Sequence, residues 1–313
     1  MALGSQWDLP SEGHVPDWVW RVLCVPALND DSPIPRRIHS RTVFEDVGVA
    51  LKDMTSLANI ICCLKDTLKA LYYMHKVGWV HRDVSVGNIL WVTDGNQGTG
   101  KLADFEYARC IRSNKFHEVQ TGTPHFMAVE VDSKIYLFEP DNDEGEGECP
   151  PFRMNGLHDI ESVWWTSTWV LFYYTDQNHP TVDLVNQWNT LQAIFPGVLG
   201  RTSRQHFFTY FKLSRCKAIT KTCEPVSKFL GEFAGHLRNA YRSAEESYPI
   251  IKLEGILEGI HRETAKNLIN VHKQYVHGDA SNVILCPLHR FLPRKRSNSE
   301  VQTSQTRQQK RRC

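Results

Sequence analysis

The sequence predicts an α+β fold that contains little strand and much helix. An early stretch, Arg41–Val49, has the pattern of a strand that leads to a turn at Gly48. Two short apolar runs, Ile89–Val92 and Leu102–Phe105, flank a Gly-rich turn and predict a β-hairpin. Apolar residues at helical spacing dominate most of the remaining sequence. Because 41 % of the 313 residues are hydrophobic, the chain can bury a sizeable core.

The first helix is expected from Leu57 to Tyr72, where apolar side chains recur every three or four residues. Ser56 can cap its amino terminus, and Gly78 ends it. After the hairpin, a segment that begins at His158 is apolar on nearly every face, which predicts a helix in the middle of a domain. Three more helical patterns follow: Val182–Phe195, Val226–Tyr241 and Ile251–Val276.

Composition excludes several classes of protein. The net charge of +1 gives no global argument for binding nucleic acid or a membrane, so we expect neither partner. The first residues lack the pattern of a signal peptide, and the longest apolar run is too short to span a bilayer. The nine cysteines form no CxxC pair, which argues against a zinc framework or a disulfide scaffold. These features predict an intracellular protein, cytoplasmic or nuclear.

Two polar segments are expected to lie outside the packed core. The acidic stretch Glu139–Glu148 predicts a solvated, mobile loop, because like charges repel and no apolar pattern orders them. Residues 293–313 are rich in Arg, Lys, Gln and Ser and predict a disordered basic tail. Its PRKR and KRR clusters fit a bipartite nuclear signal or a nucleic-acid patch as well as a plain solvated tail.

The strongest chemical signal is HRDVSVGN, His81–Asn88, between the first helix and the hairpin. Phosphoryl transfer needs a carboxylate that orients the attacking hydroxyl and accepts its proton. It also needs hard oxygen ligands for Mg²⁺, which neutralises charge on the phosphates. Asp83 fits the first role, and Asn88, five residues later on the same loop, fits the second.

Three further signals follow in order. In LADFEYA, Asp104 ends a strand; such an Asp is usually a turn or cap residue, but here it lies at the expected distance after HRDxxxxN. The segment GTPHFMAVE, Gly122–Glu130, comes next. Asp159 then opens the buried helix, where a carboxylate must find partners. Asp159 braces the backbone of the loop at His81 to Asp83, caps the helix, or does both.

These motifs, in this order, resemble the eukaryotic protein kinase superfamily. More narrowly, HRDxSxGNIL, DF followed by an acidic residue, GTPxFMA and HDIES together resemble the fungal-type protein kinases. The resemblance covers most of the chain, from Arg41 to Leu292. It implies a protein-kinase-like fold with a truncated or diverged β-rich N-lobe and hinge in residues 1–55, a mostly helical C-lobe in 56–292, and the tail 293–313.

The resemblance also implies transfer of the γ-phosphate of ATP to a Ser or Thr of a protein substrate. Asp83 would be the catalytic base, and Asn88 and Asp104 would hold Mg²⁺. Thr123 would contact Asp83 and help to position the substrate hydroxyl. Arg82 would hold the activation segment, through a phosphate on one of two residues outside the motifs, Thr121 or Ser113.

Other motif residues would be structural. His81 would pack near Phe105, Asp159 would brace the catalytic loop, and Glu130 would be anchored to an Arg in the helical lobe. Which Arg this is, and the oligomeric state, do not follow from the sequence.

Several departures from the family pattern bear on activity. Glu106 replaces the glycine of DFG, and Ser85 stands where most Ser/Thr kinases have a lysine that contacts the γ-phosphate. No GxGxxG and no VAIK-like lysine precede Leu51; Lys52 lies too near the hinge, and Glu12 is a weak candidate for the lysine-pairing Glu. The alternative function is therefore a catalytically weak or inactive pseudokinase scaffold.

A third hypothesis is a small-molecule kinase. HGDASN, His277–Asn282, resembles the HGD loop of small-molecule phosphotransferases. Its Asn follows Asp279 by three residues rather than five, and no DFG-like strand comes after it, which favours coincidence. The segment GTPHFMAVE also argues against this function, because the corresponding kinase segment positions peptides.

Overall fold

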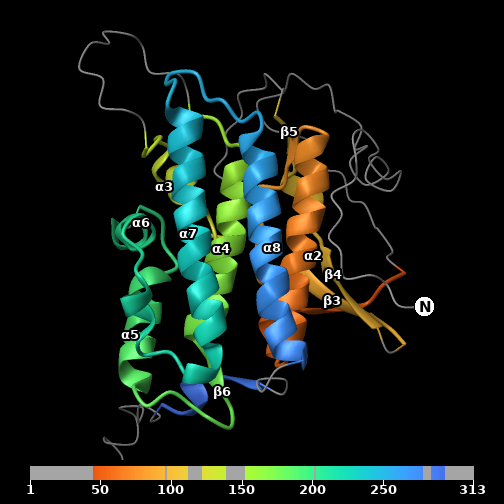
Figure 1. Cartoon of the computed structure of the whole chain (residues 1–313), viewed down its shortest axis with the longest axis vertical. Coiled ribbons are helices and arrows are strands. Elements are labelled where there is room, and N and C mark those ends of the chain that lie inside the picture. Colours follow the sequence, from red (N-terminus) through yellow and green to blue (C-terminus); the bar gives the residue numbers. More distant parts are fainter. Residues whose placement is uncertain are drawn as a thin grey trace, which may run out of the picture.

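The structure is a computed structural model that describes residues 45–95, 97–111, 122–138, 152–200, 202–277 and 283–292. Four long helices lie side by side, and a small antiparallel sheet lies beyond one edge of the group (Figure 1). The four helices are α2 (Leu57–Lys76), α4 (Gly156–Tyr173), α7 (Glu224–Glu245) and α8 (Ile256–His277). This arrangement confirms the α+β class expected from the sequence.

Helix α2 forms where the sequence predicted it, and its ends follow local rules. The side chain of Ser56 accepts a hydrogen bond from the backbone N–H of Asn59 at 3.4 Å, which caps the first turn. Gly78, just beyond the helix, has φ +76°, a conformation that glycine adopts without strain. The apolar face of α2 packs chiefly against α8 and strand β4 (Gln97–Leu102).

Helix α4 is the buried centre of the fold. It is buried along almost all of its length, including Trp164 and Trp165, whose ring centroids lie 4.8 Å apart. Its amino-terminal cap is Asn155, whose side chain accepts from the N–H of Leu157 at 2.9 Å. The ring of His158 completes a capping box by accepting from the N–H of Asn155 at 2.9 Å. The helix therefore starts before His158, and the alternative role of Asp159 as its cap is excluded because Asn155 is the cap.

The main sheet has three antiparallel strands in the order β1 (Gly48–Ala50), β3 (Ile89–Asp94) and β4. Gly48 pairs with Val92 and is the first residue of strand β1, so the predicted turn at this position is wrong. A Cβ on Gly48 would lie 2.8 Å from the Cβ of Leu90, and this close strand approach explains the glycine.

The hairpin β3–β4 is longer than the sequence predicted. The glycines Gly98 and Gly100, assigned to its loop, belong to β4, and the strand ends at Leu102 rather than at Phe105. A Cβ on Gly98 would overlap the ring of Trp91, and a Cβ on Gly100 would lie 2.6 Å from the Cα of Cys63 on α2. These glycines therefore permit close packing rather than chain reversal.

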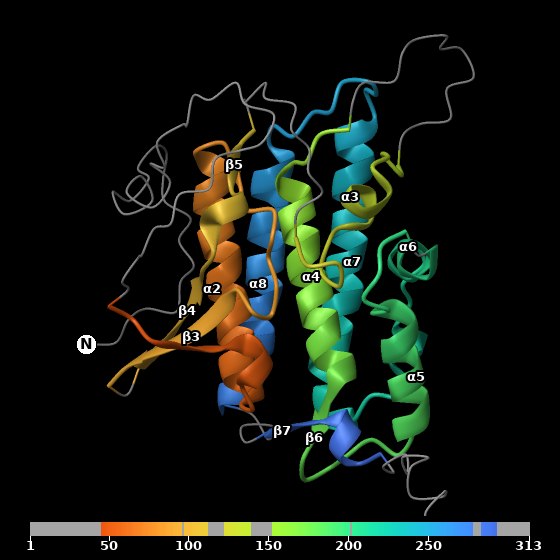
Figure 2. The ribbon, with the colours of Figure 1, turned by 180° about the vertical axis from the view of Figure 1, so that it is seen from behind.

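Short elements complete the fold around the four helices (Figure 2). The other predicted helices appear with small shifts: the segments expected from Val182, Val226 and Ile251 form α5 (Leu184–Ile194), α7 and α8. The sequence did not predict the remaining elements: α3 (Val129–Ser133), α6 (Thr202–Thr209), the strands β2 (Trp79–Val80), β5 (Arg109–Cys110), β6 (Tyr174–Asp176) and β7 (Leu285–Pro287), and the 3₁₀ turns η1 (Leu51–Asp53), η2 (Phe105–Tyr107), η3 (Leu213–Cys216), η4 (Lys221–Cys223) and η5 (Leu288–Arg290).

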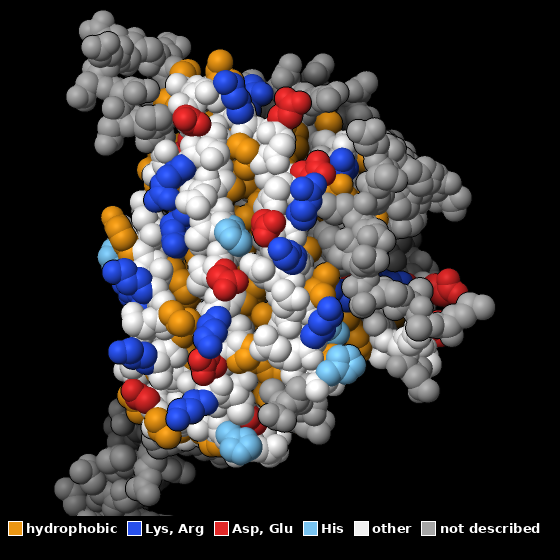
Figure 3. All heavy atoms as spheres, in the orientation of Figure 1, with side chains coloured by type: hydrophobic (Ala, Val, Ile, Leu, Met, Phe, Trp, Pro, Cys, Tyr) orange, Lys and Arg blue, Asp and Glu red, His pale blue; other side chains and the backbone are white. Residues whose placement is uncertain are grey.

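The surface formed by α7 and α8 carries basic and acidic side chains intermixed (Figure 3), in keeping with the net charge of +1. Among the described residues, no helix is both long and apolar enough to cross a membrane. The acidic stretch 139–148 and the tail 293–313 lie outside the described residues, as do residues 1–44. The predicted lobe and tail boundaries therefore stay predictions.

Candidate functional site

The loop from His81 to Asn88, called the catalytic loop below, connects β2 to β3. Strand β2 pairs with β5 through Trp79–Cys110 and Val80–Arg109, and this pairing returns the chain after Asp104 to the start of the loop. Arg82 has φ +74°, in the left-handed region that non-glycine residues rarely occupy. Such strain persists where surrounding contacts fix the backbone, and it is frequent at functional sites.

Asp159 on α4 supplies those contacts. Its side chain is fully buried and accepts two backbone hydrogen bonds, from the N–H of His81 at 2.7 Å and from the N–H of Arg82 at 2.9 Å. His75 on α2 bonds the same carboxylate at 3.2 Å. Burial acts to raise the pKa of Asp159, but the bond from His75 and the other contacts outweigh it and hold the pKa low. An ionised carboxylate thus fixes the backbone immediately before Asp83.

The carboxylate of Asp83 is held on both oxygens. Oδ1 accepts from the backbone N–H and from the hydroxyl of Thr123, each at 2.9 Å. Oδ2 accepts from the side-chain amide of Asn88 at 3.1 Å, and the same amide nitrogen donates to the backbone carbonyl of Asp83 at 2.9 Å. The three residues, two from one loop and one from a segment 40 residues later, form a single hydrogen-bonded unit.

Asp104 lies beside this unit. The backbone N–H of Ala103 donates to the carbonyl of Asn88 at 2.8 Å, which joins the two segments. Asp104 itself has φ +65°, a second non-glycine residue in the left-handed region. The charges of Asp83 and Asp104 both raise the pKa values of His81 and of the phenol of Tyr107, although burial lowers the pKa of His81 overall.

His81 links the two segments as a neutral ring. Its Nε2 lies 3.1 Å from the carbonyl oxygen of Ala103, which can only accept, so Nε2 carries the proton. Its Nδ1 then accepts from the backbone N–H of Asp83 at 3.3 Å. Burial lowers the pKa of His81, which favours the neutral form. The ring meets that of Phe105 edge to face at 5.1 Å.

The segment Gly122–Glu130 lies against the catalytic loop. Gly122 has φ +115°, and a Cβ there would lie 2.8 Å from the carbonyl oxygen of Arg82, so only glycine fits. Farther along, the N–H of Val129 donates to the buried carboxylate of Glu161 at 2.8 Å. The start of the segment is thus fixed to the loop and its end to α4.

Arg204 on α6 holds the middle of this segment. Its side chain is buried and donates to three backbone carbonyls, of Pro124 at 2.9 Å, His125 at 2.9 Å and Met127 at 2.7 Å. The guanidinium lies 4.3 Å from the ring of Trp165, a cation–π contact. These contacts fix the path of the backbone that follows Thr123.

Glu130 is fully buried at the end of the segment. We expected an arginine as its anchor, but the contact described in the helical lobe is His158 of α4, whose Nε2 lies 3.1 Å from Oε2. Oε1 accepts from the N–H of Leu137 at 3.1 Å. Burial lowers the pKa of His158 to about 4, so this partner is a neutral hydrogen-bond donor rather than a cation.

Two more buried carboxylates lie near Glu130. Burial raises the pKa of Glu161, whose oxygens accept from the hydroxyl of Tyr241 at 2.6 Å and from the indole of Trp165 at 2.9 Å. Burial, followed by the charge of Glu130, raises the pKa of Glu245 to about 8. This cluster holds the end of the segment through hydrogen bonds more than through charge.

The departures from the family pattern also have a structural description. The hydroxyl of Ser85 accepts from the N–H of Gly87 at 3.3 Å, so this side chain serves a turn within the loop. Glu106 raises the pKa of the exposed phenol of Tyr107. The backbone of Lys52 donates to Val86, in the catalytic loop, at 3.2 Å. Four other sequence candidates lie outside the described residues: Glu12, Ser113, Thr121 and the segment 278–282.

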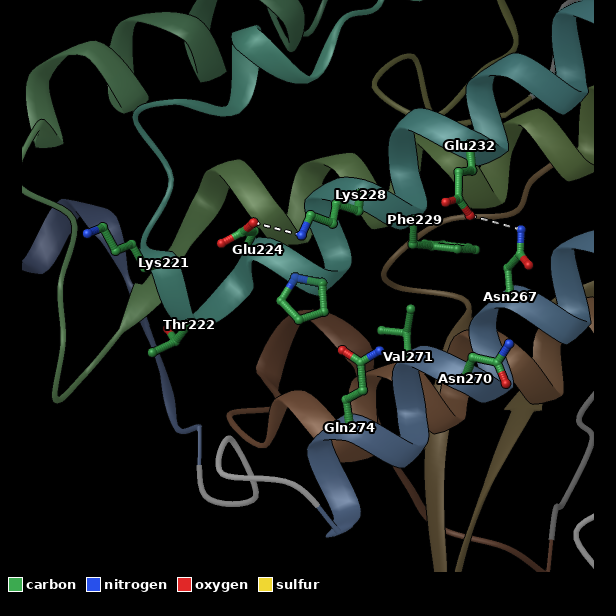
Figure 4. Close-up of a pocket in the computed structure, with 11 residues that line it drawn as sticks. Lys221, Thr222, Glu224, Lys228, Phe229, Glu232, Asn267, Asn270, Val271 and Gln274 are labelled. Carbon is green, nitrogen blue, oxygen red and sulfur yellow. Dashed lines mark hydrogen bonds and ion pairs between the residues drawn. The ribbon is translucent and has the colours of Figure 1, made fainter.

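A groove between α7 and α8 lies away from all of these residues (Figure 4). Its charged side chains are partly paired: Lys228 contacts Glu224 at 2.8 Å, and Asn267 donates to Glu232 at 3.2 Å. No residue of the four motifs lines it. The groove is therefore separate from the candidate site.

Sequence reasoning missed the residues that support the site from a distance. Arg204 lies on a helix with no clear apolar period, so no signal pointed to it. His75 is different, because it follows Leu64, Leu68 and Leu71 on the buried face of α2. A histidine on such a face must find a polar partner, and that requirement was a usable signal.

Comparison with known proteins agrees with this geometry. The sequence pattern of the family described as fungal protein kinase matches residues 12–171. The serine/threonine-protein kinase cst-1 of Caenorhabditis elegans is 40 % identical over 91 residues, which are 29 % of this chain and 18 % of that protein. The serine/threonine-protein kinase pakC of Dictyostelium discoideum is 41 % identical over 69 residues, 22 % of this chain and 14 % of that protein.

A third relative, the serine/threonine-protein kinase STE20 of Eremothecium gossypii, is 39 % identical over 71 residues, 22 % of this chain and 7 % of that protein. The chain thus spans less than a fifth of the length of the curated relatives named here. The family match covers half of the chain, and the mostly helical α+β fold is that of a kinase C-lobe. The chain belongs to the fungal protein kinase family.

Proposed function

We propose that this chain transfers the γ-phosphate of ATP to a Ser or Thr hydroxyl of a protein substrate, with Asp83 as the catalytic base. The observation that carries the proposal is the pair of contacts that hold the carboxylate of Asp83. Thr123 donates twice to Oδ1, and Asn88 donates to Oδ2. A carboxylate held in this way is pre-oriented to accept the proton of an incoming hydroxyl.

The donor set at the site fits Mg²⁺. The amide nitrogen of Asn88 is engaged by Asp83, which leaves its carbonyl oxygen for a metal. The second ligand would be the carboxylate of Asp104, which follows Ala103, whose N–H donates to the backbone carbonyl of Asn88. These are hard oxygen ligands, and Mg²⁺ usually takes one or two such groups together with the phosphates of a nucleotide. Within the described ranges, no cluster of three or more His, Cys, Asp or Glu side chains could hold a metal alone. The bound ion would neutralise charge on the transferred phosphate.

The segment after Thr123 supports a protein substrate. Arg204 donates to the carbonyls of Pro124, His125 and Met127, so the backbone that follows Thr123 is held in place. His125 packs near Phe126 and Phe195, with ring centroids 6.1 Å away in each case. The buried rings of Phe126 and Phe195 support this backbone from the core, so an extended peptide would meet a preformed segment next to the base.

The proposal is tested by transfer of radiolabelled phosphate from Mg²⁺·ATP to a generic protein substrate. Asp83→Asn removes the base and keeps the shape, so we expect a loss of about 10²–10⁴-fold in kcat. Asp104→Asn should abolish transfer through weakened metal binding. Asp94→Asn, at the exposed end of β3, is the matched control and should keep full activity. Equal transfer by wild type and Asp83→Asn would exclude Asp83 as the base.

The second candidate is a kinase-like scaffold without turnover. Ser85 favours this candidate, because most Ser/Thr kinases have a lysine at this position. The hydroxyl of Ser85 instead accepts a hydrogen bond from the backbone N–H of Gly87. A thermal shift separates the two functions: an active kinase should be stabilised by Mg²⁺·ATP in wild type and in Asp83→Asn but not in Asp104→Asn. Absence of any shift in wild type would support the scaffold.

A further inference from the structure

A chain of buried hydrogen bonds joins helix α8 to the catalytic loop. Nε2 of His261 on α8 lies 2.9 Å from Nδ1 of His75 on α2, and Nε2 of His75 lies 3.2 Å from Oδ2 of Asp159 on α4. Asp159 in turn accepts the backbone N–H groups of His81 and Arg82. His261 and Asp159 are fully buried, and His75 is 9 % exposed.

The contacts define where the protons lie. The carboxylate of Asp159 accepts, so Nε2 of His75 donates to it. Among the described residues, Nδ1 of His261 has no hydrogen-bond partner. A buried N–H without an acceptor is rarer than a buried acceptor without a donor, which assigns the proton of His261 to Nε2. The order of donation is then His261 to His75 to Asp159.

The surroundings of these rings are closely packed. A Cβ on Gly156, at the start of α4, would lie 3.0 Å from Nδ1 of His75 and 3.0 Å from Leu257, so the space is filled. The ring of Tyr72 meets that of His261 edge to face at 5.5 Å. In such a buried environment each hydrogen bond is strong, and an unpaired polar group is costly.

We propose that His261 is a positioning residue for the catalytic loop. By donating to His75, it fixes the ring whose other nitrogen holds Asp159, and Asp159 fixes the two peptide groups before Asp83. The expected effect of this role on reaction rate rests on the proposed phosphotransfer function. The contact itself joins helices whose residues are 186 positions apart.

The test uses two substitutions of His261 and one control. His261→Leu removes the donor, whereas His261→Gln offers an amide N–H in a similar place. The control is His272→Leu. His272 lies three turns further along the same helix, where Lys65 and Asp66 rather than His75 act on it electrostatically. Amide hydrogen exchange at His81 and Arg82 is measured by NMR, with the amides of α4 as an internal reference for global stability.

We expect exchange at these two amides to be about tenfold faster in His261→Leu, the equilibrium effect of one lost buried hydrogen bond. Exchange in His261→Gln and His272→Leu should stay near wild type, and α4 should be unchanged throughout. If phosphate transfer is measurable, kcat should be lower in His261→Leu than in wild type, with an unchanged KM for ATP. The kcat of His261→Gln should be close to that of wild type.

Unchanged exchange at His81 and Arg82 in His261→Leu would overturn the positioning role, whether or not the protein transfers phosphate. Faster exchange in His261→Leu, together with no transfer by the wild type, would keep the positioning role and refute the phosphotransfer function. If His261→Leu does not fold, ¹⁵N shifts of the wild-type ring decide: a proton on Nδ1 of His261 would contradict the proposed order.

Discussion

Replacing Arg204 by methionine removes three hydrogen bonds at once and leaves three backbone carbonyls without their donor. Each bond from a charged group to a carbonyl contributes about 1.5–3 kcal/mol. Burial lowers the pKa of Arg204 from 12.5 to about 10, with Asp132 acting in the opposite direction. That net shift corresponds to about 3 kcal/mol, the balance of burial against Asp132, and it offsets part of the gain. Removal of one partner from such an arrangement costs about 3–5 kcal/mol, which is the expected loss in free energy of unfolding.

The assay is a urea titration followed by tryptophan fluorescence, since Trp165 lies directly against the guanidinium. Arg238→Met is the control. Within the described residues, the half-buried Arg238 donates one hydrogen bond to a backbone carbonyl, that of Phe208 at 3.0 Å, so its loss should cost about 1.5 kcal/mol, the lower end of the range for one such bond. Arg204→Lys keeps the charge but cannot reach three carbonyls, so it should fall between wild type and Arg204→Met.

If the protein is a kinase, Arg204→Lys should also raise KM for a peptide without changing KM for ATP. An unfolding free energy of Arg204→Met within about 1 kcal/mol of wild type would refute the reasoning, because this is smaller than the loss of one such bond.

Three other substitutions probe the packing and the buried acids, each by urea titration. Gly100→Ala should destabilise the fold by about 1–3 kcal/mol, because its Cβ would lie 2.6 Å from Cα of Cys63. An unchanged urea midpoint would mean that the hairpin does not pack closely against α2. Gly235→Ala, with nothing within 4 Å of its Cβ, should stabilise helix α7 by about 0.5–1 kcal/mol, and a destabilised variant would contradict that. Burial, then the charge of Glu130, raises the pKa of Glu245 from 4.5 to about 8. Protonated Glu245 therefore contributes to the free energy of unfolding at low pH, and this contribution is lost as pH rises through about 8. The free energy of unfolding of Glu245→Gln, relative to that of wild type, should therefore rise by at most about 1.4 kcal/mol per pH unit between about pH 6 and pH 8. If the unfolding free energies of the two proteins change with pH in parallel, the pKa of Glu245 is not raised.

The sequence predicted the elements whose signals are local. The apolar period and Ser56 gave α2, and the apolar segment after His158 gave the buried helix α4. The residues around Asp83 were also found from sequence, because the family pattern fixes their spacing. The structure adds the hydrogen bonds that Asp83 makes with Thr123 and Asn88.

What the sequence did not predict depends on contacts between distant segments. The glycines of β4 had the composition of a turn, but their role is the close approach of α2 and Trp91. Asp159 had the position of a cap, yet Asn155 caps the helix and Asp159 serves the catalytic loop. Arg204 and His261 act on segments about 80 and 180 residues away, and no local pattern marks such partners.

The central claim is that Asp83, Asn88 and Asp104 surround one nucleotide-bound divalent cation. It is tested most directly by NMR with Mn²⁺ in place of Mg²⁺, since this paramagnetic ion broadens the signals of nuclei close to it. In the presence of ATP, we predict broadening at the amides of these three residues and sharp signals from Asn267 and Gln274 in the α7–α8 groove. Saturating Mn²⁺·ATP that leaves the three signals sharp, or broadens those of the groove instead, would contradict the account.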